Sequence, residues 1–106
     1  MGEVLAQIPE PKKEKLKEYR SELVNVFTKI SSDKMLTHEF LLDIMTPAEF
    51  DEAAIRWQIV KKLKKGDTHR QVAGDLGIGI STVNRGSREL RNKNGGFALM
   101  LKKLGL

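Results

Sequence analysis

Apolar residues recur at every third or fourth position over most of the chain, a spacing that places them on one face of an α-helix. The first stripe predicts a helix from Pro11 to about Ile30, and its members are Leu16, Tyr19, Leu23, Val26, Phe27 and Ile30. A polar run at 31–33 interrupts the stripe and can cap a second helix over about 34–44. Residues 1–10 have no such stripe, and we expect a flexible arm there.

The third predicted helix has the strongest start signal. Thr46 can cap it, Pro47 suits its first position, and Glu49 can reach back to the N–H of the cap. The helix ends in the basic run 61–65 and Gly66, which suit the helix dipole and a left-handed cap. Its apolar positions, among which we interpret Trp57 as a core residue, are Phe50, Ala53, Ala54, Trp57, Val60 and Leu63.

Two short helices with a tight turn between them follow. Thr68 and Gln71 form another capping-box pattern that opens the first of them. The turn is Gly-Ile-Gly at 77–79, and the second helix begins at Ile80 or Ser81. Because sustained strand-like alternation is missing, we predict an all-α fold. We expect a single domain over 1–106, comprising the arm 1–10, dimerisation helices over 11–66, a helix-turn-helix over 68–92 and a C-terminal helix over 97–104.

Charge is distributed unevenly along the chain. Residues 1–55 contain 7 basic and 11 acidic residues, a net charge of −4, whereas residues 56–106 contain 12 and 3, a net charge of +9. A basic segment of this kind suits a polyanion, because neutralising phosphates releases their condensed counterions. A solvated basic surface without a partner explains the charge alone equally well.

Composition excludes several other functions. There is no cysteine, and the two histidines, His38 and His69, stand far apart, so we expect no disulfide and no metal site. No apolar run approaches the roughly 18 residues that span a membrane, and the N-terminus has no signal-peptide pattern. We therefore expect a cytoplasmic protein without a membrane partner. A chain this short buries only about two-thirds of its unfolded surface, so a dimer would add stability.

The segment from Thr68 to Leu90 has the features of a helix-turn-helix. Ala73 is small where two helices must pack closely, and Gly77 stands at the turn, where a positive φ is favoured. The positions that can face inward are Val72, Leu76, Ile78, Val83 and Leu90. The exposed positions of the second helix combine short hydrogen-bonding groups with arginines, which suits groove reading and phosphate contact, and they are Ser81, Thr82, Asn84, Arg85 and Arg88. An ordinary helical hairpin explains each feature singly, whereas their combination favours duplex DNA.

The chain also resembles the bacterial tryptophan repressor family from about Leu41 to Leu90, and more weakly to Leu106. The most specific part of the resemblance is the run 76–87, Leu-Gly-Ile-Gly-Ile-Ser-Thr-Val-Asn-Arg-Gly-Ser. Other matching residues are Leu41, Leu42, Met45, Thr46, Pro47, Arg56, Ile59, Val60 and Gly66. The resemblance implies an intertwined all-helical homodimer that binds operator DNA, with L-tryptophan as co-repressor.

The resemblance also implies roles for individual residues. Arg56 and Arg85 would sandwich the indole ring of the ligand, a favourable cation–π arrangement, and Arg85 would meet its carboxylate. The segment that caps the ligand from the other subunit is matched by Ile44, Met45 and Thr46. Ile59 matches part of the pocket wall. Gly86 matches a position where a side chain would crowd the indole. The residues implied in DNA binding are His69, Arg70, Ile80, Ser81, Thr82 and Asn84.

The sequence departs from the family at Glu89, where a small polar residue often stands beside the ligand. A carboxylate there can repel the ligand carboxylate or pair with Arg85. Simpler explanations exist for the ligand residues: Arg56 can pair with Glu52, Thr46 can act only as a cap, and Gly86 can serve helix packing.

Three functions therefore stay open, of which a repressor gated by L-tryptophan is the leading one. The others are a ligand-independent helix-turn-helix regulator and a helical protein-interaction module. We do not expect an enzyme, because no nucleophile–base pair, metal-ligand spacing or phosphate-binding loop is evident.

Overall fold

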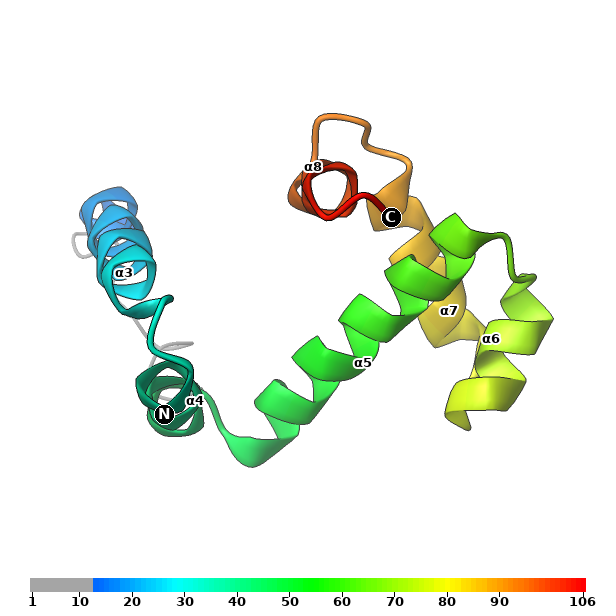
Figure 1. Cartoon of the computed structure of the whole chain (residues 1–106), viewed down its shortest axis with the longest axis horizontal. Helices are drawn as coiled ribbons and strands as arrows, with labels where there is room; N and C mark the ends of the chain where they lie inside the picture. Colours follow the sequence, from blue (N-terminus) through cyan, green and yellow to red (C-terminus); the bar gives the residue numbers. More distant parts are fainter. Residues whose placement is uncertain (1–12) are drawn as a thin grey trace. The chain divides into compact units, whose positions relative to one another are not determined.

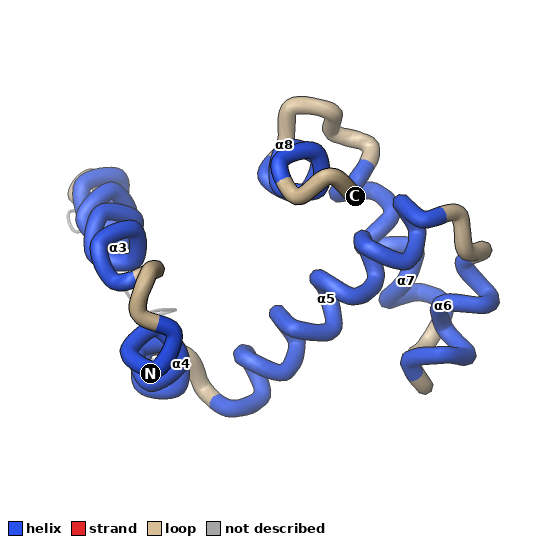
Figure 2. The backbone as a smooth tube through the Cα atoms, viewed as in Figure 1, coloured by secondary structure: helices blue, strands red, loops and turns tan. Residues whose placement is uncertain are grey.

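The computed structural model describes residues 13–106, which form six α-helices and no strand (Figures 1 and 2). The predicted all-α fold is confirmed. The predicted arm 1–10 and the predicted helix start at Pro11 lie outside the described residues, and α3 itself begins later than predicted, at Leu16, after a turn at 14–15. The helices are α3 (Leu16–Ile30), α4 (Lys34–Ile44), α5 (Pro47–Lys65), α6 (His69–Leu76), α7 (Ile80–Leu90) and α8 (Gly96–Lys103).

The chain divides into two compact units, Met1–Phe50 and Asp51–Leu106. In the first unit, α4 begins as predicted at a polar cap: the N–H of Leu36 donates to Oδ1 of Asp33 at 3.0 Å. The rings of Phe27 in α3 and Phe40 in α4 pack with their centroids 6.4 Å apart. Neither helix contains a buried residue, so both keep much of their apolar surface exposed in the single chain.

The predicted capping box at the start of α5 is confirmed. The N–H of Thr46 donates to Oε1 of Glu49 at 2.8 Å, and the N–H of Glu49 donates to Oγ1 of Thr46 at 3.1 Å. Hydrogen bonds from the backbone N–H and then the hydroxyl of Thr46 lower the pKa of the Glu49 carboxyl. These bonds satisfy groups at the helix start that would otherwise lack partners.

The second unit is built around one apolar cluster that joins three helices. Ile59 of α5, Val72 of α6 and Val83 of α7 are each at most 1% exposed. The sequence places both valines on inward faces, and the structure confirms this. Partly buried residues complete the cluster, and they are Leu63, Ala73, Leu76 and Ile78.

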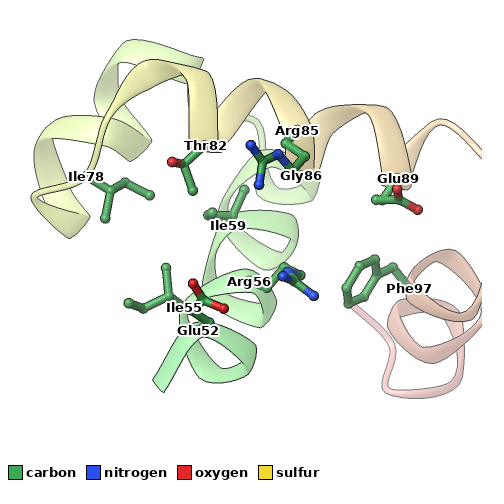
Figure 3. A pocket seen from close by; sticks show the side chains of 10 residues that line it. All are labelled: Glu52, Ile55, Arg56, Ile59, Ile78, Thr82, Arg85, Gly86, Glu89 and Phe97. Carbon is green, nitrogen blue, oxygen red and sulfur yellow. The ribbon is translucent and has the colours of Figure 1, made fainter. Parts of the chain in front are cut away.

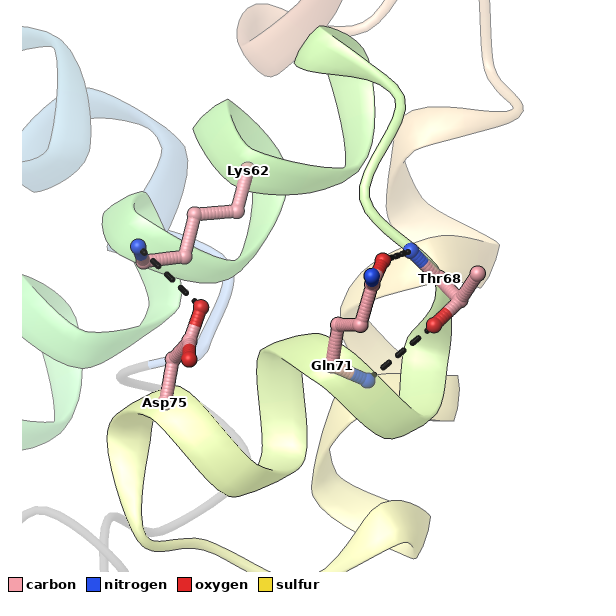
Figure 4. Close-up of polar contacts among 4 residues, drawn as sticks. All are labelled: Lys62, Thr68, Gln71 and Asp75. Carbon is pink, nitrogen blue, oxygen red and sulfur yellow. Dashed lines mark hydrogen bonds and ion pairs between the residues drawn. The ribbon is translucent and has the colours of Figure 1, made fainter.

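Helix α6 is fixed at both ends (Figure 4). At its start Thr68 and Gln71 exchange hydrogen bonds of 2.8 and 3.1 Å, which confirms the predicted capping box. Farther along, Asp75 pairs with Lys62 of α5 at 3.9 Å. At its end Gly77 adopts φ 66°, ψ 37°, and the N–H of Ile78 donates to the carbonyl of Ala73 at 3.1 Å. This hydrogen bond closes a Schellman turn, which directs the chain straight into α7.

Candidate functional site: the three faces of helix α7

Helix α7 presents three faces with different chemistry. Val83 and Gly86 are buried against the rest of the second unit. A second face lines a cavity between α5 and α7, and it carries Thr82, Arg85 and Glu89. A third face is exposed and carries Ser81, Asn84 and Arg88, and Arg91 at the C-cap continues it. Because each set repeats at intervals of three or four residues, each forms a continuous line along the helix.

The cavity, which we call the α5–α7 cavity, has a volume of about 550 Å³. This size lies within the range of about 300–1,000 Å³ that is typical of small-molecule sites. In Figure 3 the α5 side chains face those of α7, and Phe97 from the start of α8 lies at one side. The lining residues are Glu52, Ile55, Arg56, Ile59, Ile78, Thr82, Arg85, Gly86, Glu89 and Phe97.

The family resemblance assigns several residues to ligand binding, and four of them line this cavity: Arg56, Ile59, Arg85 and Gly86. Within residues 13–106, neither arginine takes part in an ion pair, so the suggested pairing of Arg56 with Glu52 is not formed. The suggested pairing of Arg85 with Glu89 is likewise not formed among these residues. Two guanidinium groups beside isoleucine and phenylalanine side chains can bind an aromatic ring and an anionic group together.

Gly86 of α7 lies directly against Ile59 of α5. It is buried, and a β-carbon there would lie 2.6 Å from Cγ2 of Ile59. Packing against Ile59 therefore requires a glycine at this position, whether or not a ligand is bound.

Met45 and Thr46 lie in the first unit, apart in sequence from the cavity residues of the second. The N–H and hydroxyl oxygen of Thr46 are both used in the α5 capping box, and its carbonyl accepts from the N–H of Phe50 at 3.0 Å. The N–H of Met45 donates to the carbonyl of Leu41 at 3.1 Å. Helix capping thus accounts for Thr46 within one chain, and its contact with a ligand stays a prediction.

The exposed face of α7 gathers three residues implied in DNA binding. His69, Ser81 and Asn84 line one shallow hollow together with Arg88 and Arg91. Nδ1 of His69 lies 2.7 Å from Oδ1 of Asn84, so a hydrogen bond joins the start of α6 to the middle of α7. We call this set, His69 of α6 with Ser81, Asn84, Arg88 and Arg91 of α7 and its C-cap, the α7 strip.

The start of α7 has no side-chain cap. Gly79 occupies the cap position and has no side chain that could accept a hydrogen bond from the helix. Backbone N–H groups of the first turn therefore stay available to an anion. Ile80 beside it is 48% exposed, and Arg70 is exposed on α6. Of the residues implied in DNA binding, Thr82 alone lines the α5–α7 cavity.

Several site residues were not predicted from the sequence. Glu52 and Ile55 precede Arg56 and Ile59 at the spacing of one helix face, a signal that was available once Arg56 was chosen. Phe97 has no such signal, because it reaches the cavity through the loop after α7. The full set of unpredicted residues is Glu52, Ile55, Ile78 and Phe97 in the cavity and Arg91 in the strip.

Residues 13–106 contain no group of three or more histidine, cysteine, aspartate or glutamate side chains placed to hold a metal ion. None of the described helices has both the length and the apolar character needed to cross a membrane.

Comparison with known proteins gives a consistent result. The sequence profile of a family described as "Trp repressor protein" matches residues 21–105. Trp operon repressor homologs of Vibrio campbellii and Vibrio parahaemolyticus are each 44% identical over 59 residues, which is 54% of this chain and 59% and 57% of those proteins. The homolog of Vibrio cholerae is 42% identical over 59 residues, 54% of this chain and 57% of that protein. The chain thus spans less than two thirds of the length of these relatives.

Proposed function

Because the chain belongs to the Trp repressor protein family, we propose that it is a cytoplasmic transcriptional repressor that binds operator DNA as a homodimer, with L-tryptophan as co-repressor. The family is named for a regulator, not for an enzyme. The observation that carries the proposal is that one helix, α7, lines a cavity containing two arginines and also presents an exposed basic face.

The α5–α7 cavity supports the ligand part of the proposal. Its apolar walls suit an indole ring, and Arg56 and Arg85 supply planar cations that stack on aromatic faces and bind carboxylates. Arg85 is the residue that we assign to the ligand carboxylate. In a dimer, Met45 and Thr46 of the partner chain would close the cavity, as the family resemblance implies.

The DNA part rests on the helix-turn-helix and its charge. Residues 56–106 carry a net charge of +9, and the uncapped start of α7 offers backbone N–H groups to a phosphate. Ile80 and Ser81 stand at this end of the helix, the part that enters the major groove in helix-turn-helix proteins.

Exposed apolar surface on α3 supports the homodimer. Tyr19, Leu23 and Phe27 follow one another at four-residue intervals and are 51%, 42% and 37% exposed. A second copy of the chain would cover such a stripe, whose exposure in a monomer would favour association.

A single coupling experiment tests the proposal. Duplexes are first selected from a random pool with the full chain and L-tryptophan, and calorimetry then measures ligand affinity with and without the selected duplex. L-tryptophan and DNA should strengthen each other's binding by the same factor, because coupling between two sites is reciprocal. DNA binding without ligand binding would favour the ligand-independent regulator. The packing of Gly86 on Ile59 is consistent with that alternative, because it explains the glycine without a ligand.

A further inference from the structure

The hydrogen bond between His69 and Asn84 determines what Asn84 can offer to a partner. The contact joins Nδ1 of His69 to Oδ1 of Asn84, and a carbonyl oxygen only accepts, so it is the tautomer with the proton on Nδ1 that donates to Asn84. One lone pair of Oδ1 is thereby used and the amide plane is held. Both N–H groups of Nδ2 remain free to donate, whereas Oδ1 keeps only its second lone pair.

The neighbours of Asn84 along the α7 strip are also donors. Arg88 and Arg91 follow at intervals of four and three residues, on the same face. Both are exposed, and neither takes part in an ion pair among residues 13–106. The strip therefore presents one amide donor and two guanidinium groups in a line, with no carboxylate among its members.

Such a line suits the oxygen atoms of a nucleic-acid backbone better than the edge of a base. Phosphate oxygens only accept hydrogen bonds, and arginine binds them with paired N–H groups. Reading adenine, by contrast, requires an asparagine to donate and accept at once. In Asn84 one of the two lone pairs of the accepting atom is already used by His69, and this contact fixes the direction of the amide.

We propose that His69 is a positioning residue that presents the Asn84 amide to a backbone phosphate of duplex DNA, and that Asn84, Arg88 and Arg91 together form a phosphate-binding line on α7. This inference rests on the proposed DNA-binding function and adds Arg88 and Arg91 to its contact residues. It assigns the reading of base sequence to other residues, such as those at the start of α7.

The first test measures how salt changes the affinity of the full chain for a duplex, with L-tryptophan present at saturation. Each phosphate contact contributes about −0.9 to the slope of log affinity against log salt concentration. Arg88→Gln and Arg91→Gln should each reduce the magnitude of this slope by about 0.9. Lys29→Gln, which removes the same charge from α3, is the control and should leave the slope unchanged. Slopes that do not differ from the unmodified chain would overturn the phosphate line.

The second test separates positioning by His69 from a general effect on folding. Asn84→Ala and His69→Phe should each weaken binding by about two- to tenfold, the range of one hydrogen bond. The double variant should be no weaker than the weaker single variant, because both changes remove the same contact. Losses that multiply in the double variant would show that His69 does not act through Asn84.

Sequence selection gives the third readout. The unmodified chain and Asn84→Ala should select the same duplex sequences from a random pool, with lower affinity for the variant. An adenine preference that disappears in Asn84→Ala would show that this side chain reads a base, and would overturn the inference while DNA binding itself stands. Failure of the full chain to bind any duplex would overturn the proposed function itself.

Discussion

A β-carbon on Gly86 would lie 2.6 Å from Cγ2 of Ile59, a residue of α5 that lines the cavity. The sequence suggests two reasons for this glycine, room for an indole ring and close packing of helices. The structure confirms the second reason. Because Ile59 also belongs to the core cluster with Val72 and Val83, a shift of α7 at Gly86 would disturb both the cavity and the helix-turn-helix.

Gly86→Ala should therefore destabilise the protein by about 1–3 kcal/mol, the usual effect of overpacking a core. Ile59→Leu removes the branching methyl and should cost less than about 1.5 kcal/mol alone. When Ile59→Leu is combined with Gly86→Ala, it should restore part of the free energy of unfolding that Gly86→Ala removes, as measured by urea denaturation.

Gly74→Ala is the matched control for this prediction. Gly74 also lies within a helix, and nothing lies within 4 Å of a β-carbon placed there. This substitution should stabilise α6 by up to about 1 kcal/mol. A Gly86→Ala protein as stable as the unmodified chain would contradict the close approach of α5 and α7.

Local signals in the sequence were sufficient to predict the capping boxes that open α5 and α6. Thr46 with Glu49, and Thr68 with Gln71, form capping boxes because each pair is three residues apart, a relationship fixed by the helix itself. The positive φ of Gly77 likewise follows from a turn of three residues between helices. Such features depend on neighbours in the sequence, and sequence patterns describe them well.

The cavity could be predicted only in part. Arg56 and Arg85 were identified through the family resemblance, because nothing in their local sequence shows that they face each other. Phe97 reaches the cavity through a loop, and its position depends on how α8 packs through Leu101, which is 1% exposed. The bond between His69 and Asn84 joins residues 15 positions apart and depends on the angle between α6 and α7.

The capping box of α5 predicts a pH effect. Hydrogen bonds from Thr46 lower the pKa of Glu49, so the folded state binds this proton less readily than the unfolded state. Their contribution to stability is present above the unfolded carboxyl pKa of about 4.3 and is lost as the pH falls through the lower, folded value. Glu49→Gln should reduce the acid-induced loss of unfolding free energy, measured by urea denaturation between about pH 6 and pH 3. The control is Asp51→Asn, and an identical loss in Glu49→Gln and the unmodified chain would contradict this assignment.

The proposed homodimer predicts the effect of a charge on the apolar stripe of α3. Leu23→Asp should dissociate the dimer, because burying an unpaired carboxylate in an apolar interface is costly. Light scattering after size-exclusion chromatography should then give the chain mass of 12.0 kDa instead of twice that value. Glu22→Ala, at the neighbouring exposed position, should leave the mass unchanged. A Leu23→Asp protein that stays dimeric would place the interface elsewhere.

Glu89 predicts the ligand preference of the cavity. It lies four residues after Arg85 on α7, so its carboxylate stands beside the group that we assign to the ligand carboxylate. The ammonium group of L-tryptophan offsets the resulting repulsion, whereas indole-3-propionate has a carboxylate and no ammonium. The unmodified chain should therefore prefer L-tryptophan.

Glu89→Ser should raise the affinity for indole-3-propionate relative to L-tryptophan by about five- to tenfold, which corresponds to roughly 1 kcal/mol between unit charges a few ångströms apart in water. Calorimetry with both ligands measures this ratio directly. Glu52→Gln removes the other carboxylate that lines the cavity and shows whether the preference belongs to Glu89 alone. If both ligands gain equally in Glu89→Ser, the side chain obstructs the cavity by its size. In that case the charge of Glu89 does not select the ligand.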